Sequence, residues 1–434
     1  MLKAIIADWL KKPDRMLFST VYRKERYYAR LARRAMHFKD WPQAVEYWQK
    51  ALAHCSEDDK SRALIHRELA RSFVRLKDTE KVEEHMKTYL ELSLGSQLEE
   101  VMQGIRNKLF PEVGTVDSRY MYLGGRVNYG FVEHWPVEKT ASGNDRGYLT
   151  KIARAGSTGV KKEKRFYRQI CERFSVLQEF TPPLVDITEI KEKDLTFLTL
   201  RKIAGTVPDN KEFLDGISGV QEILAAIKYD QIKGCLDDDL TSGFWLDHTK
   251  VPVGRRTGYT FASIHQPTTN KKIINWLYQK AAGQKGAGEL QAQIGRIKHL
   301  ILDRQLYARL DPGVNYCLAH GDFGRYNLLA DSDGRVYVLD WSNYLAAPRG
   351  YDMAYYFRKI KWKWRKIEKE FLACPERSGY LTPLEKIFFI YALIVLRFVE
   401  EFTDTPFRED YRKFLEPAVD CLEKLVAGQL VRAP

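Results

Sequence analysis

One short stretch near residue 320 constrains this chain more than any other part of its sequence. The run His320-Gly-Asp-Phe-Gly-Arg-Tyr-Asn-Leu-Leu329 precedes an apolar segment, Val336–Leu339, which ends at Asp340. Two carboxylates and an amide (Asp322, Asp340 and Asn327) therefore flank a predicted strand. Oxygen ligands of this kind suit Mg²⁺ held against phosphates, and a carboxylate can also accept the proton of an alcohol. The alternative is that the three side chains only cap turns and satisfy loop backbone.

This arrangement resembles the aminoglycoside phosphotransferase and choline kinase superfamily, which has the protein-kinase-like fold. The family pattern is His-Gly-Asp, four residues, Asn, and then an apolar strand that ends in Asp-Trp or Asp-Phe. A Pro-x-x-x-Asp-x-Ala tail usually follows, and Pro348, Asp352 and Ala354 supply it here. Trp341-Ser342 stands where protein kinases have Phe-Gly. Asp352 is expected to accept hydrogen bonds from N–H groups of the preceding loop.

The resemblance implies a role for each polar residue of the segment. Asp322 would orient and deprotonate the acceptor hydroxyl, and Asn327 and Asp340 would bind Mg²⁺. His320 would brace the loop by hydrogen bonding. Arg325 would meet the transferring phosphoryl group or an anionic acceptor, and the alternative is that it faces solvent.

A glycine-containing loop further upstream resembles the phosphate-covering loop of choline-kinase-like enzymes. Leu123-Gly-Gly-Arg-Val-Asn-Tyr-Gly130 contains its Gly-Gly-x-x-Asn pattern, which assigns Gly124, Gly125 and Asn128 to the nucleotide phosphates. Glycines let backbone N–H groups approach phosphates closely. A glycine pair is also common in hairpins for turn reasons alone.

A lysine and a glutamate complete the predicted nucleotide site. Lys151 lies in the apolar segment Tyr148–Ala153, where the resemblance implies a lysine that neutralises the inner phosphates. Glu163 is its expected partner on the following helix, because it shares a helix face with the apolar residues three, four and seven positions later. The alternatives are a solvent-facing edge-strand lysine and a surface glutamate, with Glu172 as the substitute partner.

The nearby segment Leu198-Thr-Leu-Arg-Lys-Ile-Ala-Gly205 resembles the family's hinge, where backbone groups contact the base. Family members often have an acidic residue near Arg201, and this chain does not. ATP is the expected nucleotide, with GTP as the alternative.

Strand and helix patterns predict the fold class. Strand-like segments are found at Tyr120–Leu123, Phe131–Pro136, Tyr148–Ile152, Leu184–Ile190 and Leu195–Arg201, with a helix from Val160 to Glu179 between the third and fourth. That is the order of a kinase small lobe, and the remainder is mainly helical apart from a loop-rich stretch at 237–269. We therefore predict an α+β, bilobal kinase-like fold preceded by an α-helical repeat domain. The predicted domains are 1–112 (helical), 113–204 (N-lobe) and 205–434 (C-lobe).

The helical repeat is visible in the sequence itself. Leu31-Ala-Arg-Arg, with Lys39-Asp40 after it, reappears 38 positions later as Leu69-Ala-Arg-Ser, with Lys77-Asp78 after it. Each copy has the pattern of a helix, a turn and a second helix, similar to a tetratricopeptide unit although longer than its usual 34 residues. Helices near residues 1–18 and 95–109 would flank the array. The array would bind a protein partner, or it would be a purely structural extension.

Charge and composition narrow the partners. Lysine and arginine outnumber aspartate and glutamate by 70 to 57, a formal net charge of +13. Such a field favours anionic partners over a polycationic acceptor. The six cysteines have no metal-ligand spacing, and the most apolar stretch, Ile387–Val399, is too short to span a bilayer. With no signal-peptide pattern at the N-terminus, a cytoplasmic protein is predicted, with peripheral contact at the inner membrane face left open.

The identity of the acceptor is the least constrained part. Acidic candidates for its site are Asp237–Asp239 and the group from Glu400 to Asp404, and basic candidates are Arg255-Arg256 with Tyr259. The segment Arg358–Lys366, predicted to be one helix, interleaves cations and tryptophans and could contact an anionic surface or saccharide.

Three functions follow from these patterns. The first is ATP- and Mg²⁺-dependent phosphate transfer to a hydroxyl of a sugar, as in a bacterial cell-surface polysaccharide. The second is the same chemistry on a free amino alcohol or aminoglycoside, and the third is a non-catalytic kinase-like scaffold. A basic cleft would favour the first and an acidic or aromatic pocket the second; no nucleic-acid partner is expected.

Overall fold

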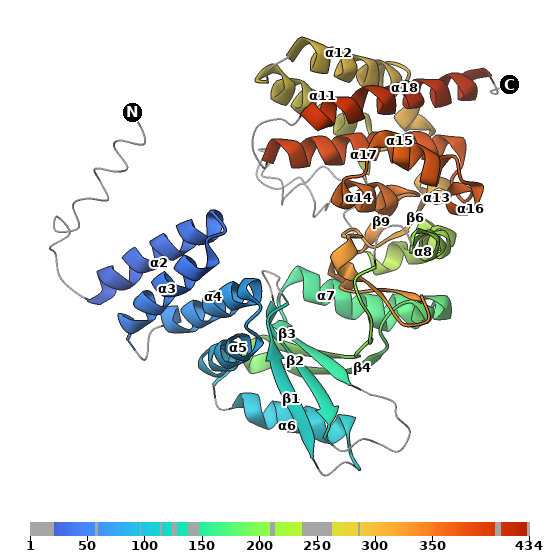
Figure 1. Cartoon of the computed structure of the whole chain (residues 1–434). Coiled ribbons are helices and arrows are strands. Elements are labelled where there is room, and N and C mark those ends of the chain that lie inside the picture. The colour runs from blue at the N-terminus through green and yellow to red at the C-terminus, as the bar shows by residue number, and fades with distance from the viewer. Residues whose placement is uncertain are drawn as a thin grey trace, which may run out of the picture. The chain divides into compact units, whose positions relative to one another are not determined.

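The fold is taken from a computed structural model of the chain (Figure 1). It describes residues 21–56, 60–95, 97–112, 115–123, 128–137, 147–208, 213–236, 263–284, 287–403 and 409–431. The chain forms two compact units: the first runs to Ala155 and includes Val185–Arg201, and the second comprises Gly156–Leu184 and everything from Lys202 onward. The domain limits predicted at residues 112 and 204 stay a prediction.

The first unit begins with helices in antiparallel pairs. They are α2 (Val21–His37), α3 (Trp41–Ala53), α4 (Lys60–Leu76), α5 (Thr79–Leu94) and α6 (Gln97–Leu109). The helix predicted near residues 1–18 lies outside the described residues. The 38-residue repeat is present in three dimensions, although its likeness to tetratricopeptide units stays a prediction.

The two helix–helix turns are built in the same way. Lys39 and Lys77 both adopt a left-handed conformation with φ of 62°. Asp40 and Asp78 follow them, and each carboxylate accepts a hydrogen bond from the N–H three residues later, at 3.3 and 3.2 Å. A side-chain acceptor at this position satisfies an N–H that the first helical turn leaves unpaired. The repeated Lys-Asp pair therefore ends one helix and begins the next.

A five-stranded sheet completes the first unit. Its strands are β1 (Val116–Met121), β2 (Asn128–Pro136), β3 (Tyr148–Arg154), β4 (Leu184–Ile190) and β5 (Leu195–Arg201), in the order β1-β2-β3-β5-β4. The pairs β1–β2, β2–β3 and β3–β5 are antiparallel. All five strands were predicted, and so was the α+β class with helices before the sheet. Because β3 lies in the middle of the sheet, its residues are not edge-strand residues.

The helices and the sheet share one hydrophobic core. Val132, Ile152 and Phe197 on the strands are at most 1% exposed and belong to the same buried cluster as Met86 and Leu90 on α5. α5 approaches the sheet closely at Gly130, where a Cβ would lie 2.8 Å from the Met86 Cε. The array thus packs on one face of the sheet through α5 (Figure 1). Partner binding by its other surfaces stays a prediction.

Buried histidines make the first unit sensitive to acid. His66 and His85 lie Nδ1 to Nδ1 at 3.1 Å between α4 and α5, and His134 on β2 is fully buried, 2.8 Å from the Ser118 hydroxyl. Burial, and then neighbouring positive charge, lowers the pKa of His66 and of His134 from 6.5 to about 4. The unfolded chain therefore binds more protons than the folded one between those values, so stability is lost as pH falls from 6.5 toward 4.

We expect the free energy of unfolding to fall by about 1–2 kcal/mol for each of these two histidines between pH 7 and pH 5. Urea unfolding followed by circular dichroism at both pH values measures this. His134→Gln should reduce the pH dependence, whereas His37→Gln, at an exposed position, should not. An equal pH dependence in the parent and His134→Gln would contradict the assignment.

The second unit is mostly helical. Its N-terminal helix is α7 (Thr158–Arg165), which continues as a π-helical turn, Phe166–Cys171. The remaining longer helices are α8 (Leu214–Ala226), α11 (Pro267–Ala282), α12 (Ala287–Lys298), α14 (Tyr351–Ile360), α17 (Pro383–Thr403) and α18 (Glu409–Val431). The apolar stretch Ile387–Val399 lies within α17. Within the described part of the chain, no helix is long and apolar enough to cross a membrane.

Two short strand pairs interrupt the helices of the second unit. β6 (Tyr316–Ala319) pairs with β9 (Leu345–Pro348), and β7 (Leu328–Ala330) pairs with β8 (Val336–Val338), both antiparallel. They enclose the sequence segment around residue 320. The loop-rich stretch predicted at 237–269 lies mainly outside the described residues, although its last residues already begin α11 at Pro267.

The prediction of one continuous helix over Arg358–Lys366 is wrong. α14 ends at Ile360, Lys361 adopts φ of 54°, and a separate helix, α15, covers Trp364–Ile367. Trp362 and Trp364 are 8% and 1% exposed. Residues two apart on a helix do not share a face, so a continuous helix would have exposed one of the two rings. The break at Lys361 lets both be buried.

Candidate active site

The loop that begins at His320 is fixed by a buried carboxylate. Asp352, on the first turn of α14, accepts hydrogen bonds from the N–H groups of His320 at 2.6 Å and Gly321 at 3.0 Å. This role for Asp352 was predicted and is confirmed. Burial raises the pKa of Asp352, and these hydrogen bonds oppose that rise. Gly321 has φ of 82°, and a Cβ there would collide with the Asn343 carbonyl, so the His-Gly-Asp sequence needs its glycine.

The His320 ring connects the loop to the end of β8. Its Nε2 lies 2.8 Å from the Leu339 carbonyl oxygen, and its Nδ1 accepts a hydrogen bond from the Asp322 N–H at 3.2 Å. Nδ1 must therefore be unprotonated, and Nε2–H is the donor to Leu339. The Leu339 N–H in turn donates to the Asn327 carbonyl at 2.8 Å. His320 thus has the bracing geometry, and one backbone residue links both ends of the segment.

Two side chains, Tyr355 and Asn327, hold Asp322 in place. The Tyr355 hydroxyl donates to Asp322 Oδ1 at 2.6 Å. The Asn327 Nδ2 donates to the Asp322 backbone carbonyl at 2.8 Å and to its Oδ2 at 3.2 Å. Since the amide nitrogen of Asn327 is used in this way, its carbonyl oxygen is directed elsewhere. The Asp322 carboxylate keeps acceptor capacity, because two oxygens offer about four lone-pair sites.

Asp340 lies at the turn that follows β8. It adopts a left-handed conformation with φ of 58° and precedes the short helix Trp341–Asn343. Aspartate and asparagine tolerate this conformation better than other non-glycine residues. Since the Leu339 N–H is bonded to Asn327, the backbone brings Asp340 to the end of the strand pair where Asn327 lies.

An aromatic stack fixes the Asp340 turn against α7. Trp341 is fully buried, stacks on Phe166 with ring centroids 4.0 Å apart, and meets the His320 ring edge-on at 4.8 Å. On α7, a Cβ at Gly159 would lie 3.4 Å from the Ser342 Cβ. The Trp-Ser pair that replaces Phe-Gly therefore serves as the packing surface for this helix.

Glu163 on α7 is a buried carboxylate. It is 1% exposed, together with Phe166, Tyr167 and Ile170, as its predicted helix face requires. Tyr167 lies close enough to feel two carboxylates: burial raises its pKa well above 10, and the charges of Glu163 and then Asp340 contribute to the rise. Glu172 is exposed, so Glu163 is the better candidate of the two.

The other predicted nucleotide-binding residues belong to the first unit. Lys151 is on β3, is 6% exposed, and pairs in register with Phe131 on β2 and Leu198 on β5. The alternative of a solvent-facing edge lysine is therefore wrong. Asn128 begins β2 and is 9% exposed, whereas Gly124 and Gly125 lie outside the described residues. The pairing of Lys151, in the first unit, with Glu163, in the second, stays a prediction.

Arg325 lies on the short helix Arg325–Asn327 with an exposed side chain. Its guanidinium donates to the Tyr326 hydroxyl at 2.9 Å and lies 4.8 Å from the centre of that ring. These contacts keep the Arg325 side chain next to the loop while leaving it accessible to a ligand. Contact with a phosphoryl group or an anionic acceptor and a solvent-facing role both stay predictions.

The oxygen donors fit a magnesium ion that is shared with phosphates. Asn327 offers an amide oxygen and Asp340 a carboxylate from the same end of the β7–β8 pair. Mg²⁺ in phosphate-transfer sites usually takes only one or two protein carboxylates and fills its other positions with phosphates and water. The described residues contain no cluster of three or more His, Cys, Asp or Glu that could hold a metal ion.

Tyr355 is the site residue that sequence analysis missed. It sits on α14 among buried aromatic residues, one helical turn after Asp352. Its aromatic character predicts only a core position, and nothing local in the sequence indicates that its hydroxyl reaches a residue 33 positions earlier.

Comparison with protein families identifies the class of this segment. Residues 249–381 match the model described as the phosphotransferase enzyme family. The match contains every residue of the loop and the Asp340 turn. The resemblance inferred from the sequence is thus confirmed, and the chain is a phosphotransferase that carries this family's domain in residues 249–381.

Solved structures similar to the chain include kinases of small molecules. Choline kinase LicA from Streptococcus pneumoniae is 14% identical, with 76% of this chain and 100% of that chain covered and a TM-score of 0.36. A thermostable mutant of aminoglycoside phosphotransferase APH(4)-Ia, in ternary complex with AMP-PNP and hygromycin B, is 17% identical, covers 75% and 98%, and has a TM-score of 0.40. A microcompartment-associated aminopropanol kinase is 14% identical, covers 76% and 95%, and has a TM-score of 0.39. A search of curated proteins found no match.

Proposed function

We propose that this protein transfers the γ-phosphate of ATP to a hydroxyl of a sugar, in a cell-surface polysaccharide or one of its precursors. The observation that carries the proposal is the Asp322 carboxylate, held by the Tyr355 hydroxyl and the Asn327 amide within a loop that Asp352 and His320 fix. Phosphate transfer to an alcohol requires a carboxylate that is held in place beside oxygen ligands for Mg²⁺.

The residues divide the chemistry among them. Asp322 accepts the proton of the acceptor hydroxyl and orients its oxygen toward the phosphorus. Asn327 and Asp340 would hold Mg²⁺, and Lys151, Asn128, Gly124 and Gly125 would bind the nucleotide phosphates. When bound, Mg²⁺ would neutralise charge on the phosphates. Glu163 would orient Lys151. Its negative charge would also compensate the positive charge of the buried lysine.

An anionic or neutral sugar suits this chain better than a cationic acceptor. The helix that supplies Tyr355 continues with Arg358 and Lys359, whose charged groups lie 5.2 and 5.5 Å from the Tyr355 ring centre. The residue that positions the base is therefore flanked by positive charge. Positive charge close to the reacting hydroxyl repels an amino alcohol or an aminoglycoside and attracts acidic saccharide.

The test is an acceptor screen with [γ-³²P]ATP and Mg²⁺. Acidic and neutral cell-envelope saccharides are compared with choline, aminopropanol and aminoglycosides, and parallel reactions contain GTP. We expect label in the saccharides and none in the cationic compounds. Preferential labelling of an amino alcohol or an aminoglycoside would replace the sugar assignment with the second function.

Removing the Tyr355 hydroxyl should slow transfer without weakening nucleotide binding. In Tyr355→Phe the ring still packs on α14, but Asp322 loses its 2.6 Å donor and with it one of its two fixed contacts. We expect kcat to fall about tenfold, in line with the loss of one positioning hydrogen bond to a charged group. The KM for ATP should stay unchanged.

Steady-state kinetics with the acceptor found in the screen separates the two constants. Tyr337→Phe, at a half-buried tyrosine on β8, is the matched control and should leave both constants unchanged. An unaltered kcat in Tyr355→Phe would show that Asp322 does not need this contact.

A further inference from the structure

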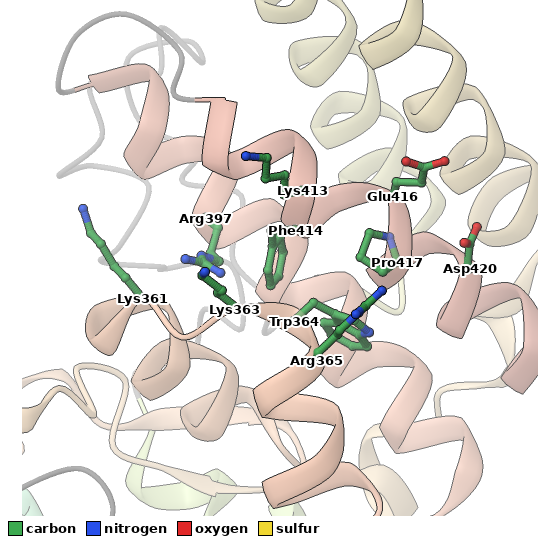
Figure 2. A pocket seen from close by; sticks show the side chains of 10 residues that line it. All are labelled: Lys361, Lys363, Trp364, Arg365, Arg397, Lys413, Phe414, Glu416, Pro417 and Asp420. Carbon is green, nitrogen blue, oxygen red and sulfur yellow. The ribbon is translucent and has the colours of Figure 1, made fainter.

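A second, strongly basic site lies within the second unit (Figure 2). It is a cavity of about 650 Å³ between the segment after α14, the start of α15, and helices α17 and α18. That volume lies in the range of sites for small organic ligands. Two of its contributing helices, α17 and α18, lie beyond residue 381, where the family match ends.

Cations dominate the lining of this cavity. Lys361, Lys363, Arg365, Arg397 and Lys413 contribute five positive charges, against two negative charges. One of the two acids, Asp420, is already paired with Arg296 at 2.7 Å. In the view of Figure 2, Glu416 and Asp420 lie at the end of the cavity opposite to Lys361, Lys363 and Arg397. A concentration of cationic side chains at one end of a cavity attracts anionic groups.

Neighbouring residues hold the Arg397 guanidinium in the lining of the cavity. Trp364 and Phe414 are 1% and 3% exposed and meet edge to face with centroids 5.8 Å apart. Arg397 donates to the Trp362 carbonyl at 2.7 Å, and its guanidinium carbon lies 4.2 Å from the Phe414 ring centre. The guanidinium plane is therefore held in place before any ligand arrives, which lowers the entropic cost of binding an oxyanion.

The cavity adjoins the end of α14, the helix that supplies Tyr355. Tyr355 and Lys361 are six residues apart at the end of α14, roughly 9 Å along a helix that rises 1.5 Å per residue. Arg358 and Lys359 lie between them. Positive charge therefore runs along α14 from the residue that contacts Asp322 to the edge of the cavity.

We propose that this cavity binds the anionic group, a phosphate or a carboxylate, of a charged saccharide acceptor whose hydroxyl lies at Asp322. The link to the acceptor rests on the proposed function, whereas the binding of a sugar oxyanion in the cavity does not. Arg397 and Lys363 contact the oxyanion, and Lys413 adds to the attraction.

Direct binding tests this without turnover. Calorimetry is done with glucose 6-phosphate, glucuronic acid and glucose, in saturating AMP-PNP and Mg²⁺ so that the nucleotide site is filled. The parent should bind both anions saturably and glucose not at all. The double variant Lys363→Gln with Lys413→Gln should bind them at least tenfold more weakly, and the matched double variant Lys280→Gln with Lys369→Gln, at exposed lysines outside the lining, should bind like the parent.

Each other result overturns the proposal. No saturable binding of either anion, or equal weakening in both double variants, would remove the site. Binding to phosphatidylglycerol vesicles that is lost only in Lys363→Gln with Lys413→Gln, without sugar-anion binding, would make it a lipid-headgroup site instead. The acceptor screen reports separately on the proposed function, since anions can bind the cavity even if no acceptor is phosphorylated.

Discussion

Asp322→Asn is expected to abolish phosphate transfer while leaving Mg²⁺-dependent nucleotide binding in place. The substitution keeps the size of the side chain but removes the charge and the proton-accepting oxygen. Positioned general-base catalysis contributes about 10²–10⁴ in rate, so kcat should fall by that factor. Nucleotide affinity should persist, because the proposed metal ligands are Asn327 and Asp340.

The hydrogen bonds around Asp322 add a second effect. Asp322 now accepts from both Tyr355 and Asn327, one on each carboxylate oxygen. An asparagine offers only one oxygen, so one of these donors would face an NH₂ group. We therefore expect a loss of about 1 kcal/mol in stability, the size of one lost hydrogen bond, which is too small to explain the loss of activity.

Calorimetry with Mg·AMP-PNP, labelled-ATP transfer assays and thermal melts are the three measurements. Asp333→Asn makes the same chemical change at an exposed position on the β7–β8 turn and should leave all three unchanged. Transfer at the parental rate in Asp322→Asn would refute the role of this carboxylate.

The features that sequence analysis predicted well depend on short-range geometry. Asp322 and Asn327 lie within one loop, so their spacing nearly determines their contact, and the β7–β8 pair brings Asp340 to the same end. The five strands could likewise be predicted from the local pattern of β-branched and aromatic residues. Asp352 could be assigned only through the family resemblance, since its contact with His320 spans 32 residues.

What the sequence did not reveal depends on how helices dock. Tyr355 reaches Asp322 only because α14 is anchored by Asp352, and neither tyrosine chemistry nor spacing predicts that. The break at Lys361 was hidden because Arg358–Lys366 has a helical pattern of charges, while the burial of Trp362 and Trp364 requires a turn. The basic cavity joins residues from 361 to 420, a separation over which no local pattern operates.

A change at Asp340 should act on nucleotide binding itself. The backbone there is left-handed, with φ of 58°, so alanine would add backbone strain to the loss of the carboxylate. Asparagine tolerates this conformation and removes only the charge. In Asp340→Asn we expect Mg²⁺ to lose most of its effect on nucleotide affinity, together with at least a hundredfold fall in transfer rate, because one of two protein ligands to the ion is weakened.

The measurement is the ratio of AMP-PNP affinities with Mg²⁺ and with EDTA, determined by calorimetry. In the parent this ratio should be large, and in Asp340→Asn it should approach one, while the affinity in EDTA stays the same. Asp340→Gly, which removes the carboxylate without any cost at positive φ, should behave in the same way. If both variants keep the parental ratio, the ion is held elsewhere and Asp340 serves only the turn.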